Sequence, residues 1–358
     1  MSSTPVAVRH VDVPTSRLRT HVLTAGPGDA PVLVLVHGNV SSARFFAPSM
    51  SVLAERYRCL APDLRGFGLS ETADVDARRG VRDFADDLHA LLAESALVPS
   101  GQPVHLLGWS LGGGVVLQYA IDHPQAVASI VLESPMSPYG FGGTRDLAGT
   151  PCWPDFAGSG GGTASPELVR RIADGDRGTG DPASPRNVLT ALYGKPPFEL
   201  PAGIEDELVD AMLQLAIGDG NYPGDAVASP NWPGTAPGER GVNNAISPKY
   251  CDLSGFAEIA GRGSRPGVLW IRGDSDQIVS DASAVDLGFL GQVGAVPGWP
   301  GADVYPPQPM VGQMRAVLDR YRAAGGTYEE RVLADCGHSP HLEHPAEFNE
   351  LVRGFLGS

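Results

Sequence analysis

The sequence predicts an α/β fold in which a mostly parallel central sheet has helices on both faces, and two observations carry this prediction. First, strand and helix patterns alternate along the first 134 residues and return after about residue 256. Such alternation is typical of crossover units that place parallel strands side by side. Second, some strand patterns are continuous apolar runs, as in Val32 to Val36. Runs of this kind are typical of strands that are buried on both faces of a sheet.

The first part of the chain supports this fold element by element. Continuous or alternating apolar runs mark the strands, and apolar residues at helical spacing mark the helices. The expected elements are antiparallel strands at 6–13 and 21–25, a strand at 32–36, a helix at about 42–57, a strand at the start of RCLAPDLRGFGLS, a helix around 81–92, a strand in PVHLLGWS, a helix at 111–121 and a strand in ASIVLES.

The alternation stops at Pro135, and glycine and proline are dense from there to about residue 255. Serine followed by proline, at Ser165 and at Ser184, predicts the starts of two short helices. A stretch of about 120 residues without a sheet pattern is too long for a loop. We therefore expect a core made of 1–134 and 256–358, with a mainly helical and looped cap inserted at 135–255.

The core pattern resumes in the last third of the chain. PGVLWIRGDSDQIV predicts a strand, and a second insertion rich in glycine and proline follows at about 283–309. A helix is expected at 310–321, and TYEERVLADCGHSPHLEHP predicts the last strand and its loop. A closing helix should turn Phe348 and Val352 inward, because they lie on one helical face.

Composition limits the classes of function. The formal net charge is −15, which disfavours nucleic acid as a partner. The first 20 residues lack the apolar segment of a secretion signal, and no stretch reaches membrane-spanning length without charge or glycine. The four cysteines are too few for a disulfide framework. We expect a cytoplasmic protein that acts on a small molecule, without a membrane partner.

Ser110 is the first candidate functional residue. It lies in Gly108-Trp109-Ser110-Leu111-Gly112, a G-x-S-x-G pattern between an expected strand and an expected helix. A strand that turns at once into a helix forces the turning residue into a strained backbone, and the flanking chains pass so closely that only glycine fits. The turn would hold the serine hydroxyl at the carboxyl edge of the sheet, where the helix N-terminus favours developing negative charge. The alternative is a glycine-rich turn with a capping serine.

A nucleophilic serine needs a base, and the base needs an orienting acid. His338 is the candidate base, because it follows Gly337 on the loop after the last expected strand. Asp276 is the first candidate acid, just past the strand VLWI. Glu133, at the end of another strand, is the second candidate, and Asp274 is the third.

The turn in VLVHGN supplies a further part of the candidate site. It can aim the backbone N–H of Asn39 at a substrate carbonyl oxygen, and the N–H of Leu111 would be the second donor of an oxyanion hole. We interpret His37 as a structural residue of this turn. A metal site is not expected, because the loop and Pro345 break the helical spacing that histidine and glutamate ligands after residue 337 would need.

With these residues assigned, the chain resembles the α/β-hydrolase family, in its serine esterase branch with a long cap insertion. The motifs HGN, DLRGFGLS, GWSLGG, GDSDQIV and CGHSPHLEHP carry the resemblance over about 20–134 and 265–357. A serine in the elbow differs from the aspartate of the similar dehalogenase and epoxide-hydrolase branches. The resemblance implies a catalytic triad without a cofactor, with roles as follows: Ser110 as nucleophile, His338 as general base, Asp276 as its partner, and the N–H groups of Asn39 and Leu111 as oxyanion hole.

The function expected from this resemblance is hydrolysis of an apolar or aromatic ester, thioester or lactone through an acyl-enzyme. A cap over the carboxyl edge of the sheet would shape the substrate pocket, for which Trp109, Tyr139 and Phe141 are candidates. The same triad would also serve a cofactor-free haloperoxidase or perhydrolase, or a carbon–carbon bond hydrolase. A small-molecule receptor that keeps the fold without turnover is the alternative from another class. The sequence carries no signal for an oligomeric state.

Overall fold

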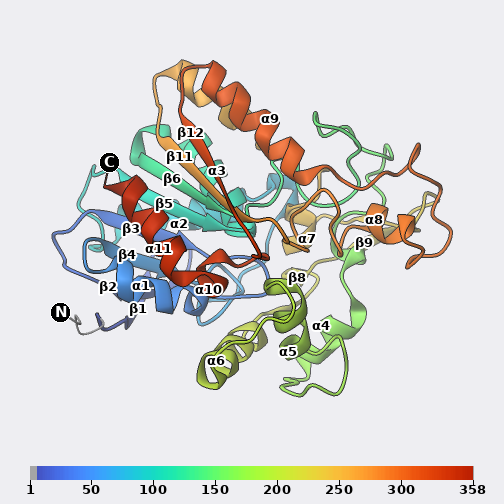
Figure 1. Cartoon of the computed structure of the whole chain (residues 1–358), viewed down its shortest axis with the longest axis horizontal. Helices are drawn as coiled ribbons and strands as arrows, with labels where there is room; N and C mark the ends of the chain where they lie inside the picture. The colour runs from blue at the N-terminus through green and yellow to red at the C-terminus, as the bar shows by residue number, and fades with distance from the viewer. Residues whose placement is uncertain (1–5, 358) are drawn as a thin grey trace.

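A computed structural model describes residues 6–357; the predicted core also includes 1–5 and 358, which lie outside the described residues. Figure 1 shows a twisted central sheet with helices packed around it. The sheet has eight strands in the order β1-β2-β4-β3-β5-β6-β11-β12. The first pairings, β1 with β2 and β2 with β4, are antiparallel, and all the others are parallel. The predicted fold class is therefore confirmed.

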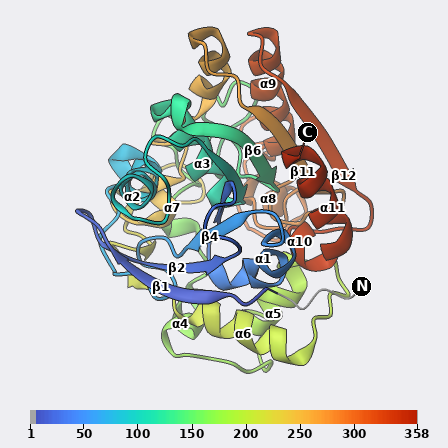
Figure 2. The ribbon, with the colours of Figure 1, turned by 90° about the vertical axis from the view of Figure 1, so that its left-hand side faces the viewer.

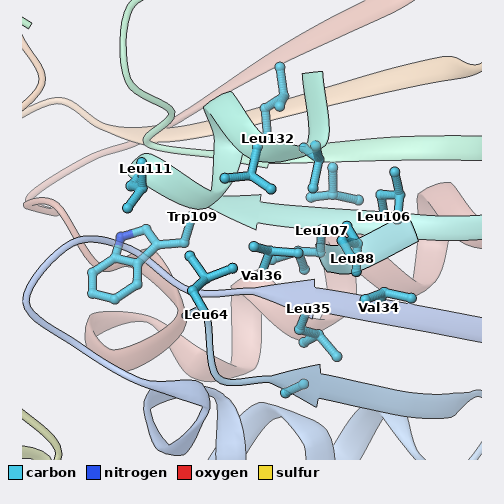
Figure 3. Close-up of a cluster of buried hydrophobic side chains, with 14 of the residues drawn as sticks. Val34, Leu35, Val36, Leu64, Leu88, Leu106, Leu107, Trp109, Leu111 and Leu132 are labelled. Carbon is cyan, nitrogen blue, oxygen red and sulfur yellow. The ribbon is translucent and has the colours of Figure 1, made fainter. Parts of the chain in front are cut away.

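The strands of this sheet lie close to their predicted positions. Their bounds are β1 Arg9–Pro14, β2 Arg19–Ala25, β3 Val32–Val36, β4 Arg58–Pro62, β5 Val104–Trp109, β6 Val127–Glu133, β11 Gly267–Gly273 and β12 Tyr328–Leu333. All five residues of β3 are buried, as its continuous apolar run predicts. Figure 3 shows side chains of β3, β5 and β6 meeting in the core, with Leu88 of a covering helix among them.

Helices cover both faces of the sheet. Helices α1 and α11 contact each other on one face, and α2 contacts α3 on the other, as Figure 2 shows. Phe348 and Val352 of α11 are fully buried, as their spacing predicts. The helices of the core are α1 Ala47–Leu53, α2 Arg82–Glu94, α3 Leu111–Asp122, α9 Met310–Ala323, α10 Pro340–Glu343 and α11 Pro345–Leu356.

The helix predicted at about 42–57 is wrong in its extent. A tight 3-10 turn, Ala43–Phe46, comes first, and α1 follows it. Pro48 has no N–H to donate to the carbonyl of Arg44, so one continuous helix from residue 42 would lose that bond. The Ser42 side chain accepts from the N–H of Arg44 and starts the tight turn instead.

The segment between β6 and β11 is largely irregular, and α6, with 12 residues, is its longest helix. Ser165 and Ser184 cap two of its helices, as predicted. It also contains short strands paired in two small sheets, which the sequence pattern did not predict. Strands of two or three residues are too short to show a period. Its elements are α4 Pro166–Ala173, α5 Pro185–Val188, a π-helical turn Leu189–Tyr193, α6 Ala202–Leu213, β7 Ile217–Gly218, β8 Tyr222–Pro223, β9 Ala226–Ala228, β10 Thr235–Pro237, α7 Val242–Ala245 and a 3-10 segment Ser254–Arg262.

Figures 1 and 2 both show α4, α5 and α6 grouped together and away from α9. The second insertion, after β11, carries one short helix, α8 Leu287–Gln292. Within residues 6–357, none of the helices combines the length and the apolar character needed to cross a membrane.

Candidate active site

Ser110 lies in a strained backbone conformation between β5 and α3. Its φ of 55° and ψ of −118° place it where non-glycine residues are rare. Two kinds of backbone bond hold it there. Its N–H donates to the carbonyl of Glu133 at 3.0 Å, and its own carbonyl accepts from the N–H of Gly113 at 2.9 Å and of Met136 at 3.0 Å. The strain is thus balanced by bonds to the end of β6 and the chain beyond it.

The two glycines beside Ser110 are required by close backbone contacts. A Cβ on Gly108 would lie 2.4 Å from the carbonyl oxygen of Gly112, and a Cβ on Gly112 would lie 2.0 Å from the carbonyl oxygen of Val36. Strands β3 and β5 therefore approach the first turn of α3 more closely than any side chain allows. This packing is the local reason for the G-x-S-x-G pattern.

His338 and Asp276 form a buried pair at the carboxyl ends of β12 and β11. His338 Nδ1 lies 2.9 Å from Asp276 Oδ2, and each side chain is 2 % exposed. The other oxygen of Asp276 accepts from the backbone N–H groups of Ile278 at 2.8 Å and Val279 at 2.9 Å. With Nδ1–H donated to the carboxylate, Nε2 of a neutral His338 is the ring's acceptor. The pair can therefore take up a proton at Nε2.

Ser110 and His338 line one cavity of about 300 Å³. Trp109 helps to bring them together, because its indole N–H donates to the carbonyl of His338 at 2.9 Å. Within the described chain, no hydrogen bond joins the Ser110 hydroxyl to the His338 ring. The structure thus brings the serine and the histidine to a shared cavity without a direct bond between them.

The backbone N–H groups of Asn39 and Leu111 are both available. Both residues line the cavity, and neither N–H donates a hydrogen bond within residues 6–357. The next N–H, that of Val40, is occupied by the Asn39 side-chain oxygen at 3.0 Å. Two unpaired donors beside one serine can stabilise an oxyanion at that position.

The cavity wall carries no aspartate, glutamate, lysine or arginine among the residues described. Its walls are mostly aliphatic and come from the segment between β6 and β11 and from the insertion after Asp276. The lining residues from these two regions are Met136, Phe141, Gly160, Thr163, Ala164, Ser165, Leu168, Val188, Leu192, Tyr193, Tyr222, Asn243, Ile246, Ile278, Val279, Ala284, Val285, Leu287 and Leu290. A cavity with this lining favours an uncharged and largely apolar ligand.

The other candidate acids have different partners. Glu133 is fully buried, and its carboxylate lies 2.7 Å from the ring of His341 and accepts that residue's backbone N–H at 2.8 Å. Asp274 is exposed and accepts from the hydroxyl of Ser275. Neither carboxylate is bonded to the ring of His338 in the described structure.

His37 is part of the turn that carries Asn39. Its Nε2 accepts from the N–H of Leu64 at 3.0 Å, and its Nδ1 lies 2.8 Å from the carbonyl oxygen of Gly38. Burial lowers the pKa of this imidazole, which favours its neutral form. A neutral His37 can accept from Leu64 and so holds the turn in place.

Of the three predicted pocket residues, only Phe141 lines the cavity in the described structure. Trp109 is fully buried behind Ser110 and stacks on Phe45, so the prediction that it lines the pocket is corrected. Figure 3 shows its indole beside Leu111. Tyr139 is also corrected, because its ring packs over Gly149, where an added Cβ would lie 2.3 Å from it.

Sequence reasoning missed Asn243, which lines the cavity from α7. No local pattern marks this residue, because its hydrogen-bond partner, the side chain of Asn39, lies about 200 residues away in the sequence. Within residues 6–357, no group of three or more histidine, cysteine or carboxylate side chains could hold a metal ion.

Comparison with known proteins supports the α/β-hydrolase fold of the chain. Residues 31–157 match the family model described as the alpha/beta hydrolase fold. The 30 kDa magnesium-chelatase subunit of Rhodobacter capsulatus is 37 % identical over 103 residues, which are 29 % of this chain and 34 % of that protein. Carboxylesterase YbfK of Bacillus subtilis is 28 % identical over 135 residues, or 38 % of this chain and 44 % of that protein. The chain thus spans less than half the length of these curated relatives.

Solved structures match over almost the whole chain at lower identity. The crystal structure of YbfK covers 98 % of this chain and 92 % of its own, with a TM-score of 0.58 and 17 % identity. The esterase RhEst1 from a Rhodococcus species covers 99 % of both chains, with a TM-score of 0.57 and 20 % identity. Likeness at this identity shows a shared fold.

Proposed function

We propose that this chain, which belongs to the α/β-hydrolase family, is a serine hydrolase of uncharged carboxylic esters. Its substrate would be an apolar or aromatic ester, thioester or lactone, cleaved through an acyl-enzyme without a cofactor. The carrying observation is that Ser110, strained at the start of α3, shares a cavity with His338, whose ring is bonded to Asp276.

In the first half-reaction, Nε2 of His338 takes the proton of the Ser110 hydroxyl, and Oγ forms a bond to the substrate carbonyl carbon. The carbonyl oxygen becomes negatively charged and accepts from the N–H groups of Asn39 and Leu111. The ester C–O bond then breaks, and the proton on His338 passes to the leaving alcohol. An acyl-serine remains.

In the second half-reaction, water replaces the alcohol. His338 takes a proton from the water, whose oxygen attacks the acyl carbon, and the same two N–H groups stabilise the second oxyanion. The bond to Oγ breaks, Ser110 regains its proton from His338, and the acid leaves. Asp276 keeps the imidazole oriented and stabilises its positive charge in both steps.

Two further features support an esterase. The cavity wall has no carboxylate or cation among the described residues, which suits a neutral ester better than an amino acid or a phosphate. The relatives that match parts of this chain include a carboxylesterase and a pimeloyl-[acyl-carrier protein] methyl ester esterase. We also propose that 135–255 acts as a cap, since this stretch supplies much of the cavity wall.

We further propose a cytoplasmic location. It is supported by the cysteines, all four of which are free and buried.

The decisive experiment compares wild type with Ser110→Ala on a p-nitrophenyl ester. Removing the nucleophile should lower kcat by several powers of ten. A fluorophosphonate probe should label wild type at Ser110, as peptide mapping by mass spectrometry would show. Near wild-type activity in the variant would refute the mechanism. A wild type that takes no label and shows no turnover would favour a non-catalytic receptor.

The base can be tested separately through pH. A protonated imidazole cannot accept the serine proton, so kcat/KM should fall as the pH is lowered from about 8 to about 5. A rate that stays flat over this range would argue against His338 as the base.

A further inference from the structure

We infer that Tyr193 is a positioning residue for the oxyanion hole, and that residues 189–195 clamp the two sides of the active site together. The inference rests on the proposed function, because it assigns a role to the turn at Asn39 and to the loop at His338. The clamp belongs to the segment between β6 and β11. In the sequence, Tyr193 is 154 residues from Asn39, and Lys195 is 148 residues from Glu343.

At one end of the clamp, the Tyr193 hydroxyl holds the oxyanion turn. It donates to the carbonyl of Asn39 at 2.8 Å and shares this proton with the carbonyl of Val40 at 3.1 Å. The ring of Tyr193 is buried against Trp109 and stands edge-on to His338. The hydroxyl is thus bonded to the carbonyl of the Asn39–Val40 peptide and to that of the next peptide, Val40–Ser41.

This turn needs external support. Val40 has a φ of 47°, a left-handed conformation that is costly for a β-branched residue. Relaxing Val40 would rotate the two peptides that meet at its Cα and would thereby shift Asn39, the residue whose N–H is the proposed oxyanion donor. A second bond from the same inserted segment opposes this rotation, because the Asn39 side-chain amide donates to Asn243 of α7 at 3.0 Å.

At the other end, the clamp lies directly against the loop that carries His338. A Cβ on Gly337 would lie 2.5 Å from the backbone nitrogen of Lys195 and 2.6 Å from the carbonyl carbon of Gly194. The Glu343 carboxylate joins the two chains, accepting the N–H of Lys195 at 2.7 Å and that of Gly337 at 2.9 Å. It also accepts the N–H of Ser339 at 3.2 Å.

One short segment is therefore bonded to the oxyanion turn and to the base loop, although these lie about 300 residues apart in sequence. The geometry predicts that loosening either end disturbs the transition state more than substrate binding, because both ends hold groups that act on the reacting carbonyl.

The test uses Tyr193→Phe, which removes one hydroxyl and keeps the ring. Its matched control is Tyr321→Phe, because the Tyr321 hydroxyl is also buried and donates to a backbone carbonyl, that of Pro266 at 2.7 Å, in the core. Both variants and wild type are assayed for kcat and KM on p-nitrophenyl butyrate and for fluorophosphonate labelling at Ser110.

We expect Tyr193→Phe to lower kcat by about 10-fold to 100-fold with KM nearly unchanged, less than loss of a whole oxyanion donor. Tyr321→Phe should keep the wild-type kcat. An unchanged kcat in Tyr193→Phe, or a raised KM alone, would overturn the inference. Labelling of wild type at Ser110 in the same experiment would still support the proposed function. If wild type is neither labelled nor active, both proposals fall.

Glu343→Gln tests whether the two ends act as one clamp. Its amide has one acceptor oxygen in place of two, and its NH2 group would face backbone N–H groups. The bonds that the two carboxylate oxygens accept from Lys195, Gly337 and Ser339 can therefore not all be kept. In the double variant with Tyr193→Phe, the losses of kcat should not multiply, since groups coupled through one segment are non-additive. Strictly multiplicative losses would show that the ends act independently.

Discussion

The core and the segment between β6 and β11 contribute to the site in different ways. The core supplies Ser110, Asp276 and His338 from the chain just after β5, β11 and β12, three paired strands of the central sheet. The N–H of Ser110 is also bonded to the carbonyl at the end of β6. The segment between β6 and β11 has strands of two or three residues, mostly short helices apart from α6, and many glycines with positive φ. It supplies the cavity wall and the bonds to the oxyanion turn. The regular region thus holds the three residues of the proposed triad, and the irregular region shapes the cavity beside them.

This difference predicts that core substitutions abolish the reaction, whereas substitutions in inserted segments adjust it. The largest effect is expected from Asp276→Asn. An amide in place of the carboxylate favours the wrong imidazole tautomer, and kcat should fall by about 10³-fold to 10⁴-fold on a p-nitrophenyl ester. The circular dichroism spectrum should stay unchanged. Asp274→Asn, two residues earlier and exposed, is the control and should retain activity. Equal losses in both variants would argue against a special role for Asp276.

The next largest effect is expected on stability, from a substitution at a close backbone contact in the core. Gly112→Ala places a Cβ where the Val36 carbonyl oxygen would be 2.0 Å away, and should lower the free energy of unfolding by about 3 kcal/mol or more. Urea denaturation measures this change.

Gly354→Ala is the control for this prediction. Gly354 also lies in a helix, α11, but no atom surrounds its added Cβ within 4 Å. Alanine there should leave stability unchanged or raise it by up to about 1 kcal/mol. An unchanged free energy of unfolding in Gly112→Ala would show that the backbones of β3 and α3 can move apart to admit a methyl group.

A smaller effect is expected in the insertion after β11. Asp286 is buried, and burial raises the pKa of its carboxyl to about 6. Since an unfolded aspartate titrates near 3.9, the folded protein binds the extra proton between about pH 4 and pH 6, and stability falls as the pH rises through this window. The full loss is on the order of 3 kcal/mol and persists above pH 6.

Asp286→Asn should remove this dependence while its oxygen can still accept from the N–H of Phe289. The variant should therefore become more stable relative to wild type, in free energy of unfolding, as the pH is raised from 4 to 7. The same difference at both pH values would mean that Asp286 titrates normally.

The smallest effect is a change of selectivity at the cavity wall. Leu290→Ala enlarges the cavity from α8, and should raise kcat/KM for longer acyl chains relative to acetate by about 10-fold. Leu147→Ala, at a side chain that is 53 % exposed, is the control and should not alter the ratio. A chain-length series of p-nitrophenyl esters gives the ratios. An unchanged dependence of kcat/KM on acyl chain length would indicate that the acyl group contacts a part of the cavity wall other than Leu290.

The sequence alone determined the core of this protein to a large extent. The continuous apolar run predicted β3 residue for residue, and the glycines around Ser110 predicted a strained turn between a strand and a helix. These features depend on neighbours in the chain, through burial patterns and backbone freedom, so they are readable locally.

Only the tertiary structure decided which carboxylate meets which histidine. Asp276 and Glu133 both follow or end a core strand, yet the first is bonded to His338 and the second to His341. It also decided that Phe141 lines the cavity while Tyr139 does not. Segments without a repeating pattern make contacts that depend on how the whole chain packs. The free energy of that packing is a sum over distant residues, so it cannot be read from any short stretch of sequence.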